Sequence, residues 1–219
     1  MMDKTVKKLT LKYALTMMVI ILLLVGIFYI ISRQISSKDI LTFDENIISF
    51  VQKYISEDVT IWVLRLTDLG SIHFIVPAII VVSLLLLWRK KYALVIFILS
   101  ANVFGGILNK SLKWFFKRER PDILPVIMEK GYSFPSGHSM GSLILYGSIA
   151  YILIHLVHSR WGKVMSILVA GFLILAIGIS RIYLGVHYPT DIVGGYSIGT
   201  AFLLLCILAF RYYEQRTGK

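Results

Sequence analysis

Long apolar stretches without a charged side chain divide this sequence, and short segments rich in Asp, Glu, Lys or Arg separate them. The stretches are Tyr13 to Ser32, Leu69 to Trp88, Tyr92 to Asn109, Ser139 to Ser159, Val164 to Ser180 and Ile192 to Phe210. Each is close to the roughly 20 residues that an α-helix needs to cross a hydrocarbon core of about 30 Å. The pattern predicts an all-α integral membrane bundle of six transmembrane helices, which form a single domain over residues 1–219.

A different periodicity marks the segment between the first two stretches. Apolar side chains recur there at helical spacing, and charged or amide side chains fall on the other faces. The apolar positions are Ile40, Phe43, Ile47, Ile48, Val51, Tyr54 and Ile55, and the polar positions are Asp44, Glu45, Gln52, Lys53 and Glu57. A short amphipathic helix in the outer membrane interface fits this pattern. A connector packed on the bundle fits it equally well.

Composition and charge agree with a membrane protein. Hydrophobic residues make up 57% of the 219 residues, whereas ~45–50% is usual in soluble domains. The net charge of +11 would suggest a nucleic-acid partner in a soluble protein. Here the basic residues concentrate in the segments that share a side with the N-terminus, so the positive-inside rule predicts a multi-pass cell-membrane protein with both termini in the cytoplasm. We expect no nucleic-acid partner.

The connections after the third and fifth stretches are separated by one helical hairpin, so they open on the same membrane face. In our topology this is the outer face. Ionisable side chains gather at these connections: Lys113, Arg120, His138, Arg181, His187 and Asp191. Each taken singly could be an interfacial anchor, a helix cap or a hydrogen-bonded structural residue. Their joint location favours a functional site, because ionisable groups are costly near a membrane.

The turn Phe134-Pro135-Ser136-Gly137-His138 directly precedes the fourth stretch. Ser136 is a good N-cap candidate, and Gly137 lets a ligand approach the backbone closely. The free N–H groups and the positive dipole end of a helix start favour an anion there. Guanidinium groups match phosphate oxygens in geometry. The cations that we expect to complete a phosphate clamp are Lys113, Arg120 and Arg181.

The second connection carries His187, Pro189 and Asp191. Proline suits the first turn of a helix, so the last helix is expected to begin near Pro189. Asp191 then lies in its first turn and can hydrogen-bond one ring nitrogen of His187. The other ring nitrogen keeps a fixed lone pair, which is what a nucleophile requires.

Three segments together resemble the signature of the type 2 phosphatidic acid phosphatase family. They are K-W-F-F-K-R-E-R-P (113–121), P-S-G-H (135–138) and S-R-I-Y-L-G-V-H-Y-P-T-D (180–191), so the core motifs span residues 113–191. The short connections resemble the bacterial phosphatidylglycerophosphatase B branch. The resemblance implies a membrane lipid phosphatase that works through a phosphohistidine intermediate.

The resemblance also implies a role for each matching residue. His187 would be the nucleophile, Asp191 would orient it, and His138 would act as general acid. The groups that would hold the phosphate oxygens are Lys113, Arg120, Arg181 and the backbone N–H groups around Ser136 and Gly137. The nearby acids Glu119, Asp122 and Glu129 are not paired at ligand spacing, so we expect no metal and no cofactor.

The implied substrate is a membrane lipid phosphate. We favour phosphatidylglycerol phosphate, with undecaprenyl pyrophosphate or phosphatidic acid as alternatives. A phosphotransferase could use the same site, and a non-enzymatic lipid-binding protein could use the basic loop to attract anionic head groups. The sequence does not determine the oligomeric state.

A rival motif overlaps the turn before the fourth stretch. Residues 137–141 fit the G-x-S-x-G pattern of serine hydrolases, with Ser139 as nucleophile. That motif requires a strand, a sharp turn and a helix within an α/β sheet. The sequence has no alternating segments to build such a sheet, so a serine lipase is disfavoured.

Overall fold

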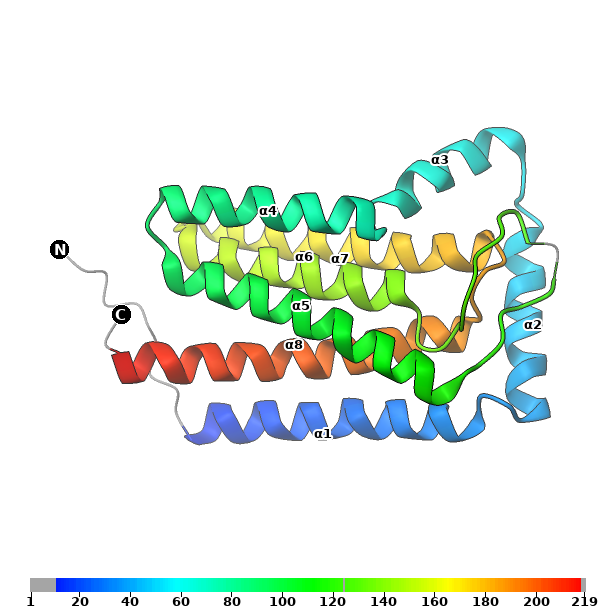
Figure 1. Ribbon diagram of the computed structural model, residues 1–219, viewed down its shortest axis with the longest axis horizontal. Helices are drawn as coiled ribbons and strands as arrows, with labels where there is room; N and C mark the ends of the chain where they lie inside the picture. The colour runs from blue at the N-terminus through cyan, green and yellow to red at the C-terminus, as the bar shows by residue number, and fades with distance from the viewer. Residues whose placement is uncertain (1–10, 124, 218–219) are drawn as a thin grey trace.

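The computed structural model describes residues 11–123 and 125–217 (Figure 1). Within these residues every regular element is an α-helix. The helices are α1 (Leu11–Gln34), α2 (Lys38–Gln52), α3 (Glu57–Asp68), α4 (Ile72–Trp88), α5 (Tyr92–Phe116), α6 (Gly137–Leu156), α7 (Arg160–Tyr183) and α8 (Pro189–Thr217).

Five of the described helices, α1 and α5 to α8, are long and apolar enough to cross a membrane. A sixth span results when α4, which has 17 residues, is counted together with α3, which precedes it across a short break at an angle of 46°. The predicted all-α membrane bundle is confirmed. The predicted bounds of the second span are wrong at their start, because Leu69 to Ser71 lie in the break between α3 and α4.

Close packing explains the glycine at this break. A Cβ atom added to Gly70 would lie 2.6 Å from Cγ2 of Ile177 on α7, and 3.3 Å from Cδ2 of His138 on α6. The chain therefore bends at a point where it packs tightly against both helices. Ser71 precedes α4 in an extended conformation and starts the new helix.

Helix α6 is the centre of the bundle and packs against α5, α7 and α8, whereas α1 packs along α8 (Figure 1). Only Ile21 and Phe28 of α1 are buried. Most of its other apolar side chains are exposed and are therefore left for contact with lipid, whereas Ile31 is partly buried against the core. One end of the bundle carries the start of α1 and the end of α8, and the connections 117–136 and 184–188 lie at the opposite end.

Helix α2 runs across the second end of the bundle (Figure 1). Its existence is confirmed, but the predicted assignment of its faces is wrong in part. Asp44 and Ile48 are fully buried on the face that turns to the bundle, whereas Phe43 and Phe50 are more than half exposed. A carboxylate on the buried face of an interfacial helix calls for a charged partner inside the protein.

Candidate active site

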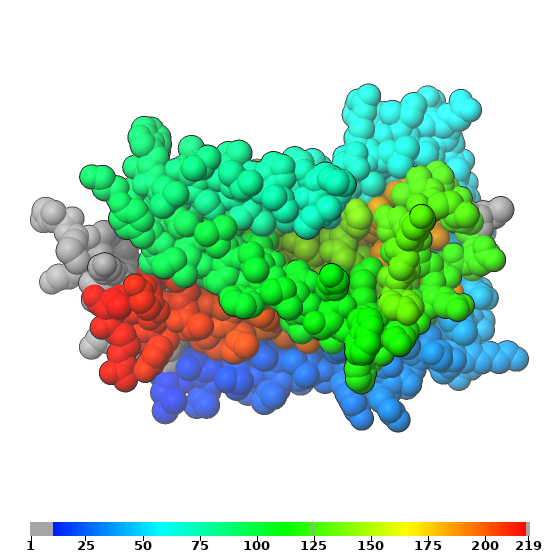
Figure 2. All heavy atoms as spheres, in the orientation of Figure 1, coloured from blue at the N-terminus to red at the C-terminus, as the bar shows by residue number. Residues whose placement is uncertain are grey.

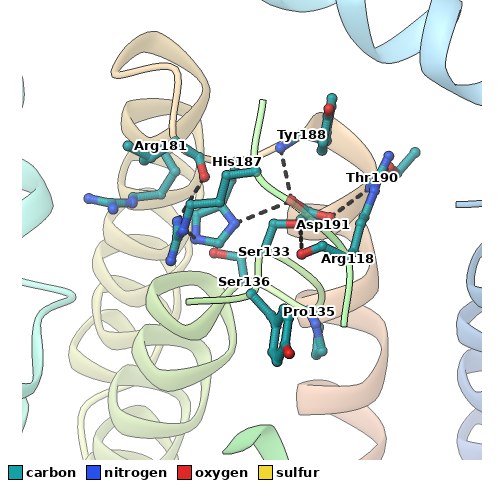
Figure 3. Close-up of polar contacts among 12 residues, drawn as sticks. Arg118, Ser133, Pro135, Ser136, Arg181, His187, Tyr188, Thr190 and Asp191 are labelled. Atoms are coloured by element: carbon teal, nitrogen blue, oxygen red, sulfur yellow. Dashed lines mark hydrogen bonds and ion pairs between the residues drawn. The ribbon is translucent and has the colours of Figure 1, made fainter. Parts of the chain in front are cut away.

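His187 and Asp191 meet where α8 begins. The helix starts at Pro189, as predicted, and Asp191 lies in its first turn. His187 Nδ1 is 3.3 Å from Asp191 Oδ2, and the same oxygen accepts a 2.9 Å hydrogen bond from the Tyr188 N–H (Figure 3). Both side chains are almost completely buried. The predicted contact between them is confirmed.

The second ring nitrogen of His187 faces a cation. Its Nε2 is 3.3 Å from Nη1 of Arg120. Burial lowers the pKa of His187 well below its ordinary value, and the positive charges of Lys113, Arg120 and Arg181 lower it further. The imidazole is therefore neutral. With Nδ1–H directed at Asp191, Nε2 carries the lone pair.

The three predicted clamp cations reach this point from different elements. Arg120 lies in the 117–136 connection and donates from Nη1 to the carbonyl of Val186 at 2.8 Å. Arg181, in the last turn of α7, is 1% exposed and donates to Oγ1 of Thr67 at 2.7 Å. Lys113, in the last turn of α5, donates to a carbonyl in the same connection as Arg120, at 2.7 Å. The end of α5, the 117–136 connection and the end of α7 thus supply one cationic cluster.

A carboxylate lies between the two arginines. Glu129 Oε2 is 3.0 Å from Nη1 of Arg120, and Glu129 Oε1 accepts a short hydrogen bond from Nη2 of Arg181. Burial alone would raise the pKa of Glu129, but the guanidinium groups of Arg181 and Arg120 lower it to about 2. The carboxylate is ionised and binds the two arginines that the sequence predicted to bind a phosphate. Sequence reasoning considered Glu129 only as a metal ligand and missed this contact.

The Pro-Ser-Gly-His turn lies beside this cluster. Ser136 caps α6, as predicted, and its Oγ accepts a 3.4 Å hydrogen bond from the Ser139 N–H. The Ser136 N–H donates to the carbonyl of Asp191 at 3.1 Å, which fixes the turn against the start of α8. A Cβ on Gly137 would lie 3.2 Å from Oδ1 of Asn109 on α5. His138 lies in the first turn of α6, where the charges of Arg181 and Glu129 act on its ring.

Ser139 does not have the surroundings of a hydrolase nucleophile. It is fully buried, and its Oγ donates to Oγ of Ser136 at 3.1 Å. It lies inside a helix, and the described residues contain no strand that could lead into a nucleophile turn. The lipase interpretation therefore lacks its structural context.

The sequence did not reveal a buried charge network that binds the other carboxylate oxygen of Asp191, Oδ1. Arg118 donates from Nη1 to Asp191 Oδ1 at 2.7 Å and from Nη2 to Asp44 Oδ2 at 2.9 Å. Thr190 joins the same group, as Figure 3 shows for Arg118, Thr190 and Asp191. Asp44 is far away in sequence and no motif includes it. Its only sequence signal is an acid next to apolar positions in a helix.

Among residues 11–123 and 125–217, no group of three or more His, Cys, Asp or Glu side chains could hold a metal ion. The positive charge of the site is supplied by Lys and Arg side chains. Metal-independent activity remains a prediction.

Comparison with known proteins places this geometry in a family. The family model that matches is that of the PAP2 superfamily, over residues 92–215. Phosphatidylglycerophosphatase B of Bacillus subtilis is 40% identical over 68% of this chain and 73% of that protein. An undecaprenyl-diphosphatase of Sulfolobus acidocaldarius is 25% identical over 58% of this chain and 60% of that protein.

A solved structure agrees with these sequence matches. The crystal structure of a transmembrane PAP2-type phosphatidylglycerolphosphate phosphatase from Bacillus subtilis superposes with a TM-score of 0.82 at 32% identity, and the match covers 86% of this chain and 94% of that one. Sequence and fold therefore lead to one conclusion: the chain belongs to the PAP2 superfamily.

Proposed function

We propose that this protein is a membrane lipid phosphatase that converts phosphatidylglycerol phosphate to phosphatidylglycerol through a phosphohistidine on His187. One observation carries the proposal. A neutral, buried imidazole directs Nε2 at the guanidinium group of Arg120, which together with Arg181 already holds an anion, the carboxylate of Glu129. A phosphate that replaces this carboxylate would have its phosphorus in front of His187 Nε2.

In the first step, Nε2 of His187 attacks the phosphorus. The N–P bond forms as the bond between phosphorus and the lipid oxygen breaks, and His138 gives its proton to the leaving alkoxide. Asp191 accepts the hydrogen bond from Nδ1–H and stabilises the positive charge that develops on the ring. The products of this step are the dephosphorylated lipid and a phosphohistidine.

In the second step, water attacks the phosphohistidine. His138, now neutral, takes a proton from the water, and the N–P bond breaks to return the neutral imidazole and release inorganic phosphate. The same residue therefore serves as acid and then as base. This exchange of roles restores every proton at the end of one turnover.

The clamp provides most of the stabilisation in both steps. Phosphoryl transfer spreads negative charge over three equatorial oxygens, so fixed cations and oriented N–H groups lower the barrier without further rearrangement. We assign this task to Lys113, Arg120 and Arg181, with the backbone N–H groups near Ser136 and Gly137. Glu129 has to leave the two arginines when the phosphate binds.

A lipid substrate fits the position of the site. Figure 2 shows a depression between α4, α5 and the 117–136 connection, with atoms of α6 visible at its floor. A head group could reach the end of the bundle there while its acyl chains stay in the bilayer. The names of the Bacillus subtilis protein and of the solved Bacillus subtilis structure favour phosphatidylglycerol phosphate, and that of the Sulfolobus relative keeps undecaprenyl pyrophosphate as the alternative.

We place the site at the outer face of the cell membrane and both termini in the cytoplasm. The support is the distribution of basic residues, since the end of the bundle opposite the site carries Arg89, Lys90 and Lys91 and the basic C-terminal part of α8. The start of α1 lies at that same end (Figure 1).

The test is phosphate release by the purified protein in detergent. Phosphatidylglycerol phosphate, phosphatidic acid and undecaprenyl pyrophosphate are offered separately in buffer without any alcohol or other phosphate acceptor, and the assay is repeated with His187→Ala and His138→Ala. We expect the highest kcat/KM with phosphatidylglycerol phosphate and no release by His187→Ala. Release that needs an added acceptor would identify a phosphotransferase, and a wild-type protein that releases nothing from any lipid would refute the proposal.

A further inference from the structure

We infer that Arg118 and Asp44 are positioning residues that hold Asp191, and through it the ring of His187, in the reactive orientation. The inference rests on the proposed function, in which His187 is the nucleophile. Neither Arg118 nor Asp44 has a hydrogen bond to His187 or to the clamp cations among the described contacts. Their effect on the reaction has to pass through Asp191 and its neighbour Thr190.

Arg118 is a buried cation, and both of its terminal nitrogens donate hydrogen bonds. It is 7% exposed, and Nη1 donates both to Asp191 Oδ1 and to Oγ1 of Thr190, at 2.7 and 2.8 Å. Its guanidinium carbon lies 4.0 Å from the centre of the Tyr188 ring. The flat group is thereby held between an aromatic face and two carboxylates, which leaves Asp191 little freedom to rotate.

Asp44 binds both Arg118 and Thr190 through its carboxylate. Its side chain is completely buried, and Oδ2 accepts hydrogen bonds from Nη2 of Arg118 at 2.9 Å and from Oγ1 of Thr190 at 2.6 Å. Oδ1 accepts the Thr190 backbone N–H at 3.0 Å. That N–H lies in the first turn of α8 and has no partner within its own helix. Asp44 therefore caps α8 from α2.

The two carboxylate oxygens of Asp191 have different hydrogen-bond partners. Oδ1 accepts from Arg118, and Oδ2 faces both the Tyr188 N–H and Nδ1 of His187. A carboxylate fixed at Oδ1 can present only one edge to the imidazole, which sets the ring plane and keeps the proton on Nδ1. If Arg118 were lost, two buried carboxylates would lie together without a countercharge, and one of them would be driven to take up a proton.

A charge pair that only held the fold together would have the same contacts but a different kinetic effect. A positioning role predicts that kcat falls while KM changes little, because the interaction matters for the transition state and not for lipid binding. It also predicts that the effect disappears once Asp191 can no longer stabilise the ring. A double-mutant cycle separates these cases.

The experiment uses full-length Arg118→Lys and Asp44→Asn, each alone and combined with Asp191→Asn, and measures kcat and KM for phosphate release from phosphatidylglycerol phosphate. Arg118→Lys keeps the charge but cannot reach both carboxylates in one plane. Asp44→Asn keeps the shape and an acceptor for the Thr190 N–H. The matched control is Arg65→Lys, because Arg65 is exposed on α3 and lies over Trp62.

We expect each single variant to lose about 10²-fold in kcat, as small misplacements of catalytic groups do. The thermal unfolding midpoint of each variant is measured alongside, because a weakened buried charge pair also lowers stability, and kcat is compared at a temperature at which every variant is folded. In the Asp191→Asn background the same substitutions should change kcat by less than about twofold. Arg65→Lys should behave as the wild type.

Full activity in both Arg118→Lys and Asp44→Asn would overturn the inference, and so would an undiminished loss in the Asp191→Asn background. If Arg118→Lys does not fold, the Asp44→Asn cycle decides alone. A wild-type protein without phosphatase activity would instead refute the proposed function. An active wild type with additive cycles would refute only the positioning role.

Discussion

Replacement of Glu129 by Gln tests whether the arginine pair is an anion site. The carboxylate of Glu129 lies between Arg120 and Arg181, and any phosphate that uses both guanidinium groups has to displace it. Gln keeps the size and one acceptor oxygen but removes the charge. We therefore expect the variant to bind phosphate more tightly than the wild type.

The size of the effect follows from the pKa of Glu129, which its surroundings lower from 4.5 to about 2. At 1.36 kcal/mol for each pKa unit, the site favours the ionised carboxylate by roughly 3 kcal/mol at most. The side chain is 26% exposed, so solvent screening reduces this value. The amide of Gln also keeps part of the hydrogen bonding. We therefore take about half of this free energy as the gain in phosphate binding, which corresponds to roughly tenfold in affinity.

The assay is competitive inhibition of lipid hydrolysis by inorganic phosphate and by vanadate. We expect both inhibition constants to fall by about tenfold in Glu129→Gln. The matched control is Glu119→Gln, an identical change at an exposed position of the same connection, where no effect is expected. Unchanged or weaker inhibition of Glu129→Gln would refute the view that Glu129 occupies the phosphate site.

Three further predictions follow from the same geometry. Burial and three cations lower the pKa of His187. Its ring signals in histidine-labelled protein should therefore show the neutral form throughout an NMR titration from pH 8 to about 5.5, which is below the unperturbed pKa of about 6.5. A titration midpoint near 6.5 would contradict this. Gly70→Ala should destabilise the protein by about 1–3 kcal/mol in thermal unfolding, because its Cβ would lie 2.6 Å from Ile177 Cγ2, whereas Gly171→Ala, which has no atom within 4 Å of its Cβ, should not; equal stability of the two variants would show that the break is not tightly packed. Prolonged treatment with a metal chelator should leave phosphate release unchanged, and a loss that added magnesium restores would reveal a metal requirement.

The membrane-spanning helices could be predicted because an uncharged stretch of sufficient length has few alternatives. Their ends could not. Helix α5 continues from Asn109 to Phe116 and includes Lys110 and Lys113, so a count that stops at the first charge ends one helix too early. Long cationic side chains extend along a helix to more polar surroundings and do not terminate it.

The second span shows what a hydropathy pattern leaves out. The stretch from Leu69 to Trp88 contains no charge, yet the helix begins only at Ile72. The break at Gly70 depends on its contacts with Ile177 and His138, which come from distant parts of the chain. A local pattern carries no information about such contacts.

The core of the site was predictable to the extent that local geometry determines it. His187 and Asp191 are four residues apart at a helix start, and their contact follows from that spacing. The role of Asp44 depends on a contact with Arg118 across 74 residues. Glu129 was visible as an acid near the site, but its position between two arginines depends on the path of the 117–136 connection. Tertiary structure alone reveals both.

The most direct test of the account is to look for phosphate on His187. Wild-type protein is mixed with ³²P-labelled phosphatidylglycerol phosphate, the reaction is stopped with alkali after a few milliseconds, and labelled peptides are identified by mass spectrometry. We predict acid-labile, alkali-stable phosphate on His187 that disappears at the rate of phosphate release. Phosphate release at the wild-type rate by His187→Ala, or label on a different residue, would contradict the central claim.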